Sequence, residues 1–201
     1  MGKAFTGEER DKVKDKLRRE GLVLLAQDGI RNVSIRELTK RAGIAQGGFY
    51  TFYKDKDEFV TDLVLLRIRE KTDLMLETKE GSLEDPVKYI SDILYREGMH
   101  LKENKAFNNH VSGSIEFFAK RDEPDNGEGR EIYRNFLRKL VTYWEENGYR
   151  VECDIDGIIY SGVMGAVMFS NADLIPEEYF AGIYREYCDA QTKRYLHVAP
   201  K

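Results

Sequence analysis

The chain has 201 residues, of which 41% are hydrophobic and 34% are charged, enough apolar content for one large domain with a small one attached. A formal net charge of −4 argues against a protein that binds polyanions over its whole surface. With two cysteines (Cys153 and Cys188), no CxxC pair, no secretory signal and no run of about 18 apolar residues, we expect reduced thiols in a cytoplasmic protein without a membrane span.

The charge is uneven along the chain. Residues 1–54 carry 12 Lys and Arg against 7 Asp and Glu, a net +5, whereas residues 55–201 carry 20 against 29, a net −9. A basic N-terminal part on an acidic body fits phosphate contact confined to one end of the protein. Ordinary variation among solvated helix faces would give the same pattern, so the charge alone does not decide.

The basic N-terminal part predicts three helices. Capping boxes of the form Ser/Thr-x-x-Glu begin at Thr6 and at Ser34, and Gly43 stands where a helix C-terminus favours a left-handed residue. A short third helix follows, with Phe49 and Tyr53 on its inner face. Two helices joined by a tight, Gly-containing turn form a helix-turn-helix, although an ordinary helical hairpin has the same local pattern.

The first helix carries several basic side chains around its apolar stripe. Most of them are expected to be solvated: Lys12, Lys14, Lys16, Arg18 and Arg19. Those nearest the N-terminus, Lys3 and Arg10, can reach a DNA phosphate if the third helix enters a groove.

The stretch GIAQGGFYTFYKDK, residues 43–56, resembles the recognition segment of the tetracycline-repressor (TetR) family. The matching positions are Gly43, Ile44, Gly47, Phe49, Tyr50, Lys54 and Lys56. Three positions depart from the family pattern: Ala45 replaces a capping Ser or Thr, Gly48 replaces a common hydroxyl residue, and Phe52 replaces the His or Tyr that usually contacts phosphate. These departures concern single DNA contacts and leave the module intact.

The chemistry of the third helix suggests how it would contact DNA. Gln46 can bond bidentately to adenine, Thr51 can contact a base or a thymine methyl group, and Gly47 and Gly48 let the backbone come close. Phosphates would be held by the N–H group at Ser34 and by the side chains of Arg36, Tyr50, Lys54 and Lys56.

The rest of the chain is predicted to be helical, which gives an all-α fold of about nine helices. We expect a helix-turn-helix DNA-binding domain over residues 1–54 and an effector-binding and dimerisation domain over residues 55–201, connected by a helix over about 55–77. Ser82 is expected to cap the next helix, helical spacing returns between residues 107 and 118, and a polar loop spans residues 121–127.

The last two predicted helices are expected to form a two-fold, four-helix dimer interface. Residues 155–172 are apolar nearly all round, so this helix must be covered on every side, and its small residues would allow close helix approach. The resemblance implies the same interface, whereas a fully intramolecular core is the alternative. The candidate interface residues are Ser161, Gly162, Gly165, Ala166, Phe180, Ile183, Tyr184 and Tyr187.

Large aromatic and methionine side chains are frequent at inward positions in the middle of the chain. Core packing explains any one of them, but together they suit an apolar pocket with a few hydroxyl groups. The resemblance implies such a pocket, holding a small effector whose binding releases DNA. The candidate lining residues are Leu66, Tyr89, Ile93, His100, Phe107, Phe118, Phe136, Tyr143, Tyr160 and Met164.

Nothing in the sequence favours an enzyme. Glu97 and His100 have the Glu-x-x-His spacing of di-iron bundles, but no second such motif exists, so we expect no metal and no cofactor. Catalytic triads, GxGxxG loops, P-loops and HExxH motifs are missing too. The sequence therefore predicts a ligand-responsive transcriptional regulator, a repressor released from operator DNA by a largely apolar or aromatic effector. The alternatives are a helical small-molecule-binding protein without DNA binding and an all-α enzyme.

Overall fold

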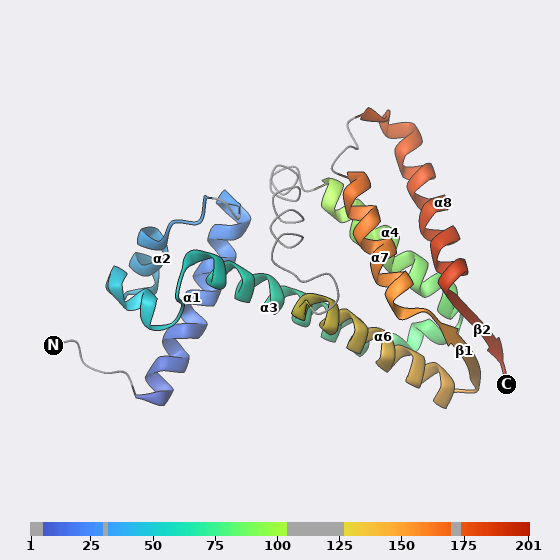
Figure 1. Ribbon diagram of the computed structural model, residues 1–201, viewed down its shortest axis with the longest axis horizontal. Helices are drawn as coiled ribbons and strands as arrows, with labels where there is room; N and C mark the ends of the chain where they lie inside the picture. The colour runs from blue at the N-terminus through green and yellow to red at the C-terminus, as the bar shows by residue number, and fades with distance from the viewer. Residues whose placement is uncertain (1–5, 30–31, 104–126, 170–173) are drawn as a thin grey trace. The chain divides into compact units, whose positions relative to one another are not determined.

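The computed structural model describes residues 6–29, 32–103, 127–169 and 174–201 (Figure 1). The chain divides into two compact units, Met1–Arg67 and Ile68–Lys201. The first contains α1 (Gly7–Asp28), α2 (Ile35–Ala42), the 3-10 helix η2 (Gln46–Thr51) and the first turns of α3 (Lys56–Glu77). The second contains the rest of α3, then η3 (Lys79–Leu83), α4 (Pro86–Glu103), α6 (Glu128–Glu146), β1 (Tyr149–Cys153), α7 (Ile155–Phe169), α8 (Glu177–Tyr195) and β2 (Leu196–Pro200).

The prediction of an all-α fold is confirmed. Helices form the body of both units, and the described residues add one two-stranded sheet. No helix of the described ranges is long and apolar enough to cross a membrane. The repeat predicted over residues 107–118 and the polar loop predicted over 121–127 lie outside the described residues, apart from Gly127.

The helix starts follow local side-chain chemistry. Thr6 forms the predicted capping box: its hydroxyl accepts from the Glu9 amide at 3.3 Å, and its own amide donates to the Glu9 carboxylate at 2.9 Å. Ser34 caps α2 by accepting from the Glu37 amide at 3.3 Å. The Glu37 carboxylate does not reach back to Ser34, because it accepts from Arg41 Nε at 2.9 Å.

The predicted cap of the fourth α-helix, Ser82, is wrong. This residue lies in η3, fully buried, where its hydroxyl donates to the Lys79 carbonyl and accepts from Trp144 Nε1 at 2.7 Å. The cap of α4 is Asp85, whose carboxylate accepts from the Lys88 amide at 2.9 Å. A buried tryptophan therefore takes the hydroxyl that the local pattern assigns to the helix start.

The core of the N-terminal unit is built around two fully buried rings. Phe49 of η2 and Phe59 of α3 meet edge to face with their centroids 5.5 Å apart, and both are 0% exposed. Leu17 and Leu24 of α1 and Leu38 of α2 complete this core. Packing of η2 against α1 and α3 therefore fixes which side of η2 faces water.

Gly21 of α1 is required by this packing, and its replacement by Ala is expected to destabilise the protein by about 1–3 kcal/mol. An added Cβ would lie 2.4 Å from Phe59 Cζ and 2.9 Å from Leu63 Cδ1, so two buried side chains would have to move. As a control, Gly162→Ala in α7 adds a Cβ whose nearest neighbour is Leu94 Cδ2 at 3.5 Å, an ordinary contact. The control should be neutral or stabilising by up to about 1 kcal/mol, because Ala favours helix more than Gly does. Urea unfolding of both variants measures the difference, and equal effects would contradict the packing argument.

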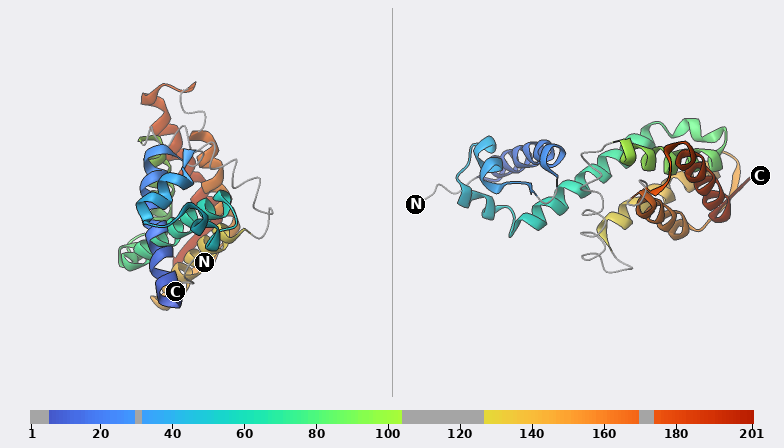
Figure 2. Two further views of the ribbon diagram at one scale, coloured as in Figure 1. Left: turned by 90° about the vertical axis from the view of Figure 1, so that its left-hand side faces the viewer. Right: turned by 90° about the horizontal axis from the view of Figure 1, so that it is seen from above.

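The C-terminal unit is a layered helical body closed by the small sheet. α4, α7 and α8 pack against one another, and α6 packs on α7 and β1 (Figure 2). β1 and β2 run antiparallel with Val151 opposite Val198. The inward side chains of both strands join the core around Trp144.

Candidate nucleic-acid interface

The turn between α2 and η2 has the geometry of a helix-turn-helix. α2 ends at Gly43, whose φ of 74° and ψ of 31° place it in the left-handed region, where a residue with a Cβ would be strained. Ile44 closes the turn, since its amide donates to the Thr39 carbonyl at 3.0 Å. η2 then begins at Gln46, after Ala45, whose side chain makes no capping hydrogen bond. The missing cap and the Gly47-Gly48 pair explain why this segment is a short 3-10 helix and not a longer α-helix.

One side of η2 is buried and the other is solvent-exposed. Phe49 is held between Tyr53 and Phe59, with the Phe49 and Tyr53 centroids 5.5 Å apart. Gln46, Gly47 and Thr51 are exposed, as is Tyr50 at 55%. The space around Gly47 is open, since an added Cβ would meet no atom within 4 Å. The side chains expected to face a groove are therefore on the surface together.

The candidate phosphate ligands lie at the start of α2, in η2 and just after it. Ser34 and Arg36 at the start of α2 are exposed, and so is Lys54, whose amide donates to the Glu58 carboxylate at 2.6 Å. Lys56 and Gly48 are half-buried. Their roles in DNA binding stay predictions.

Two cations of α1 lie against the end of η2 and the residues that follow it, and one of them, Lys14, was predicted to be solvated. Arg10 Nη2 donates to the Thr51 carbonyl at 2.9 Å, and its guanidinium lies over the Phe52 ring at 5.3 Å. Lys14 Nζ lies over the Tyr53 ring at 5.6 Å. The helical spacing of the basic residues was visible in the sequence, but their partners in residues 51–53 were not.

A half-buried ionic cluster joins α1, α3 and the end of the turn. Arg18 donates two hydrogen bonds to the Asp62 carboxylate, at 2.7 and 2.8 Å, and the Tyr53 hydroxyl donates a third at 2.7 Å. Burial alone would raise the pKa of Asp62, but the hydrogen bonds from Arg18 and Tyr53, with the charges of Arg18 and Lys14, outweigh it and lower the pKa. Burial, then the bond to Asp62, raises the pKa of Tyr53. This cluster fixes the residue at which the chain leaves the helix-turn-helix.

The structure brings only part of the predicted effector-binding set together. Phe136 is buried in the C-terminal core, and Tyr89, Ile93 and Tyr143 pack half-buried against that core. Tyr160 and Met164 are 44% and 53% exposed on α7. Leu66 belongs to the N-terminal unit. The side chain of His100 and the whole of Phe107 and Phe118 lie outside the described residues.

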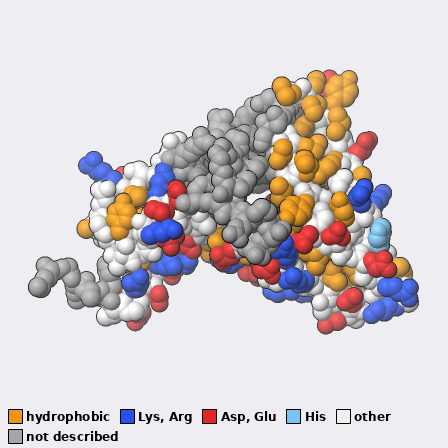
Figure 3. Space-filling model, viewed as in Figure 1, with side chains coloured by type: hydrophobic (Ala, Val, Ile, Leu, Met, Phe, Trp, Pro, Cys, Tyr) orange, Lys and Arg blue, Asp and Glu red, His pale blue; other side chains and the backbone are white. Residues whose placement is uncertain are grey.

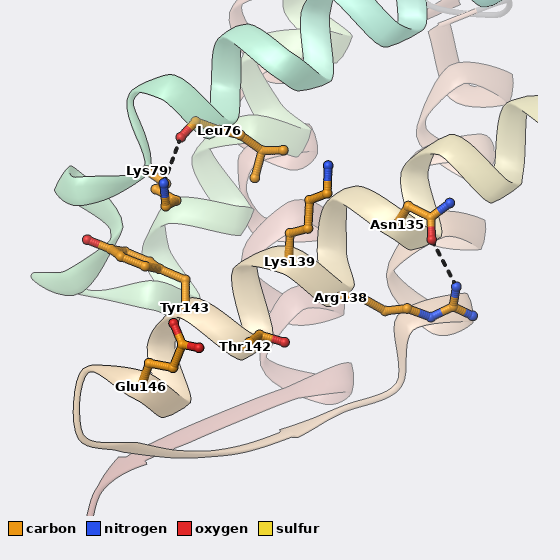
Figure 4. Close-up of a pocket in the computed structure, with 8 residues that line it drawn as sticks. All are labelled: Leu76, Lys79, Asn135, Arg138, Lys139, Thr142, Tyr143 and Glu146. Atoms are coloured by element: carbon orange, nitrogen blue, oxygen red, sulfur yellow. Dashed lines mark hydrogen bonds between the residues drawn. The ribbon is translucent and has the colours of Figure 1, made fainter.

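A groove of about 600 Å³ lies between the end of α3, η3 and α6 (Figure 4). Its lining is mainly polar and basic: Leu76, Lys79, Asn135, Arg138, Lys139, Thr142, Tyr143 and Glu146. Lys79 Nζ lies 4.9 Å from the Tyr143 ring centroid, and Arg138 turns toward Asn135. Among the described lining residues, Tyr143 alone belongs to the predicted effector set, so this groove is not the pocket that the predicted residues would line.

Four of the eight candidate interface residues are buried inside the chain itself, and the interface stays a prediction. Ser161, Gly165, Phe180 and Tyr184 are all buried without a partner subunit. A Cβ on Gly165 would lie 2.7 Å from the Tyr184 hydroxyl oxygen, and that hydroxyl donates to the Leu94 carbonyl at 3.1 Å. The small residues therefore allow α7 to pack closely on α8 and α4 of the same chain. Tyr187 is half-buried and donates to the Ser161 carbonyl at 2.9 Å, Gly162 is half-buried, and the Ala166 side chain lies outside the described residues.

Large apolar side chains on α7 and α8 remain exposed. Val163 and Met164 of α7 are 46% and 53% exposed, and Tyr179 and Ile183 of α8 are 60% and 47% exposed. We call these four residues the apolar face. Figure 3 shows hydrophobic side chains gathered over α7 and α8. Ile183 is the member of this face that the sequence had placed in the interface.

Comparison with known proteins points in the same direction as the helix-turn-helix geometry. A family model described as "Bacterial regulatory proteins, tetR family" matches residues 17–63. The HTH-type transcriptional regulator AcrR of Shigella flexneri is 27% identical over 89 residues, which cover 44% of this chain and 41% of that protein. The chain thus matches about two fifths of the length of this curated relative.

Solved structures resemble the chain over most of its length. One is RolR in complex with the ligand resorcinol, with a TM-score of 0.66, 18% identity, and coverage of 94% of this chain and 90% of that one. Another is a TetR transcriptional regulator from a Rhodococcus species, with a TM-score of 0.64, 15% identity, and coverage of 91% and 97%. At such identities the likeness establishes the fold.

Proposed function

We propose, from the membership of this chain in the tetR family of bacterial regulatory proteins, that it is a dimeric repressor released from operator DNA by a small aromatic effector. The family consists of DNA-binding regulators, so no enzymatic activity is part of this proposal. Its partners would be double-stranded DNA, a second copy of the chain and the effector, in the cytoplasm.

The proposal that the protein binds DNA rests on one observation, the exposed surface of η2. Gln46 and Thr51 of η2 are exposed while Phe49 is buried, and the space around Gly47 is open. A glutamine amide matches the donor and acceptor pattern of adenine in the major groove, and a threonine methyl suits thymine. The net charge of +5 on residues 1–54 favours approach to phosphates.

The apolar face supports the dimer. An exposed group of large apolar side chains on two adjacent helices is typical of a protein–protein contact. A contact through α7 and α8 of two copies would be a two-fold, four-helix arrangement, in which the same residues meet on both sides. Two recognition helices spaced about 34–36 Å apart could then read two half-sites of one operator.

The proposal of a small-molecule effector rests on the C-terminal core and on one structural relative. The partly buried aromatic side chains of the C-terminal core, such as Tyr89 and Tyr143, suit a small, flat ligand. RolR, whose fold this chain shares, binds resorcinol in its crystal structure. We therefore propose an aromatic effector for this chain as well.

α3 is the element through which an effector would act on DNA binding. It begins at Lys56, next to the candidate phosphate ligands, and continues to Met75, which is buried in the C-terminal core. A helix shared by both units can pass a small shift near the effector to the recognition helix, and such coupling is typically worth about 1–3 kcal/mol.

Two measurements test this proposal. The full-length protein is used to select duplexes from a random pool, and a panel of small aromatic compounds, resorcinol included, is screened by thermal shift. Calorimetry then measures the affinity of a binding compound with and without saturating selected DNA. We expect DNA to weaken that affinity about 5- to 150-fold, because coupling is reciprocal.

Each outcome separates the alternatives. Equal affinities with and without DNA would mean that the compound is no inducer. A protein that binds a compound but enriches no duplex would be the helical ligand-binding protein without DNA binding. Ala45, Gly48 and Phe52 favour this alternative, because each departs from the family pattern at a position of a possible DNA contact. A tightly bound metal or cofactor in the purified protein would favour the enzyme.

A further inference from the structure

Three cations of α1 form a row that follows the end of the helix-turn-helix. Arg10, Lys14 and Arg18 are four residues apart, so they lie on one face of the helix. Arg10 contacts Thr51 and Phe52, Lys14 lies over Tyr53, and Arg18 binds Asp62, which also holds Tyr53. The row thus runs from solvent at Arg10 to a half-buried position at Arg18.

Arg10 is held in place from the protein side by two contacts. Its Nη2 donates to the carbonyl of Thr51, the last residue of η2, at 2.9 Å. Carbonyl groups at a helix end lack partners within the helix and favour a cation. The guanidinium also lies over the Phe52 ring, with Cζ 5.3 Å from the centroid. A flat guanidinium matches this geometry better than the ammonium group of lysine does.

The charge of Arg10 is not neutralised by a carboxylate. Within the described ranges, Arg10 forms no ion pair, whereas Lys12 binds Glu8 at 2.7 Å and Arg18 binds Asp62 at 2.7 Å. A guanidinium has five N–H donors, and the described structure uses one of those of Arg10 in a hydrogen bond. Arg10 is exposed beside Thr51, itself an exposed residue of the proposed DNA-contacting surface.

We propose that Arg10 binds a backbone phosphate of DNA beside the end of the recognition helix. The Thr51 carbonyl and the Phe52 ring hold the guanidinium in position before DNA binds. Because Thr51 belongs to η2, a phosphate bound by Arg10 would also fix the position of η2. The contact is a bidentate, charge-assisted one, of the kind that arginine forms with phosphate oxygens. This inference rests on the proposed function, since it requires that the protein bind DNA.

The test uses the full-length chain and a random-sequence DNA duplex, whose binding depends on phosphate contacts alone. The affinity is measured over a range of salt concentrations for the wild type and for Arg10→Gln. We expect the slope of log affinity against log salt to fall in magnitude by about 0.9, the value of one lost phosphate contact. Arg10→Lys should keep most of the slope while binding more weakly. Lysine keeps the positive charge but cannot donate two parallel hydrogen bonds to one phosphate.

Lys12→Gln is the matched control. Lys12 lies on the same helix, two positions away and highly exposed, but it is paired with Glu8, so its slope should equal that of the wild type. Thermal unfolding of each variant separates binding from folding, and Arg10→Lys provides a second variant if Arg10→Gln proves unstable.

The outcomes distinguish the inference from the proposed function. A wild type that binds the duplex without any salt dependence, or not at all, would overturn both. Salt-dependent binding by the wild type with the same slope in Arg10→Gln would overturn the Arg10 inference alone. A weaker Arg10→Gln complex with an unchanged slope would show that Arg10 only holds η2 in place, and would also overturn it.

Discussion

Replacing Val163 by glutamate is expected to convert the protein from dimers into folded monomers at micromolar concentration. Val163 lies on the apolar face and is 46% exposed in the single chain, so the proposed dimer would bury it. A carboxylate there would lose its hydration on association, which is costly for a charged group. A two-fold interface contains the substitution twice, so we expect the dimer dissociation constant to rise more than about 100-fold, or about 3 kcal/mol.

Sedimentation velocity measures this change, with Leu74→Glu as the control. Leu74 of α3 is 62% exposed, so it is a large apolar side chain on the surface, but it lies outside α7 and α8. The control should leave the dimer intact. A Val163→Glu protein that stays dimeric at the same concentration would remove the apolar face from the interface, and a folded, monomeric wild type would remove the dimer itself.

A substitution of the small residues would be a poorer test of dimerisation. Gly165→Leu would drive its side chain into Tyr184 of the same chain, where a Cβ alone already lies 2.7 Å from the hydroxyl oxygen. Such a variant would report on how α7 packs on α8 within one subunit. The exposed side chains are therefore the ones to change.

Replacing Asp62 by alanine is expected to destabilise the protein by about 3 kcal/mol. The carboxylate accepts hydrogen bonds from both Arg18 and Tyr53, and the side chains of Arg18 and Asp62 are only 27% and 20% exposed. Removing one partner of such a pair leaves the half-buried Arg18 charge with only the more distant Asp15 carboxylate, at 3.9 Å, and an uncompensated buried charge typically costs about 3–5 kcal/mol when burial is complete. We expect the lower end of this range because some solvent reaches the pair.

Urea unfolding at neutral pH measures this loss, and Glu8→Ala supplies the comparison. Glu8 pairs with Lys12 at a similar distance, 2.7 Å, but both side chains are highly exposed, at 81% and 74%. An exposed pair of this kind typically contributes less than about 1 kcal/mol. Similar losses in the two variants would contradict the importance of the Asp62 cluster.

The same cluster predicts an acid dependence of stability. The pKa of Asp62 is lower in the folded protein than in the unfolded chain, whose Asp side chains titrate near about 3.9. Its contribution is therefore complete above that value and is lost as the pH falls through the lower, folded-state pKa. The stability difference between wild type and Asp62→Ala should be largest near neutral pH and should shrink below about pH 4. A difference that stays constant down to pH 3 would show that packing, and not charge, accounts for the loss.

The sequence by itself determined the helices of the N-terminal unit. Capping by Thr6 and Ser34 and the left-handed Gly43 are local features, decided by residues within one helical turn. Phe49 is buried and Gln46 is exposed, as the apolar and polar character of the two side chains predicts. The match of residues 17–63 to the tetR family lies in the same local region.

Only the tertiary structure decided which partners distant residues take. The β1–β2 sheet pairs Val151 with Val198, and neither short strand carries enough alternation to be predicted without the other. The Arg18–Asp62 bond likewise joins residues 44 positions apart. Ser82 was assigned to a cap because the tryptophan that takes its hydroxyl, Trp144, comes 62 positions later in the chain.

The tertiary structure also determined which side of α7 faces outward. A helix that is apolar nearly all round has no polar face to indicate which side is covered by its own chain. Packing on α4 and α8 buried Ser161 and Gly165, and it left Val163 and Met164 exposed. Small residues allow close approach to any neighbour, so their pattern predicts tight packing but cannot say whether the neighbour belongs to the same chain or to a second one.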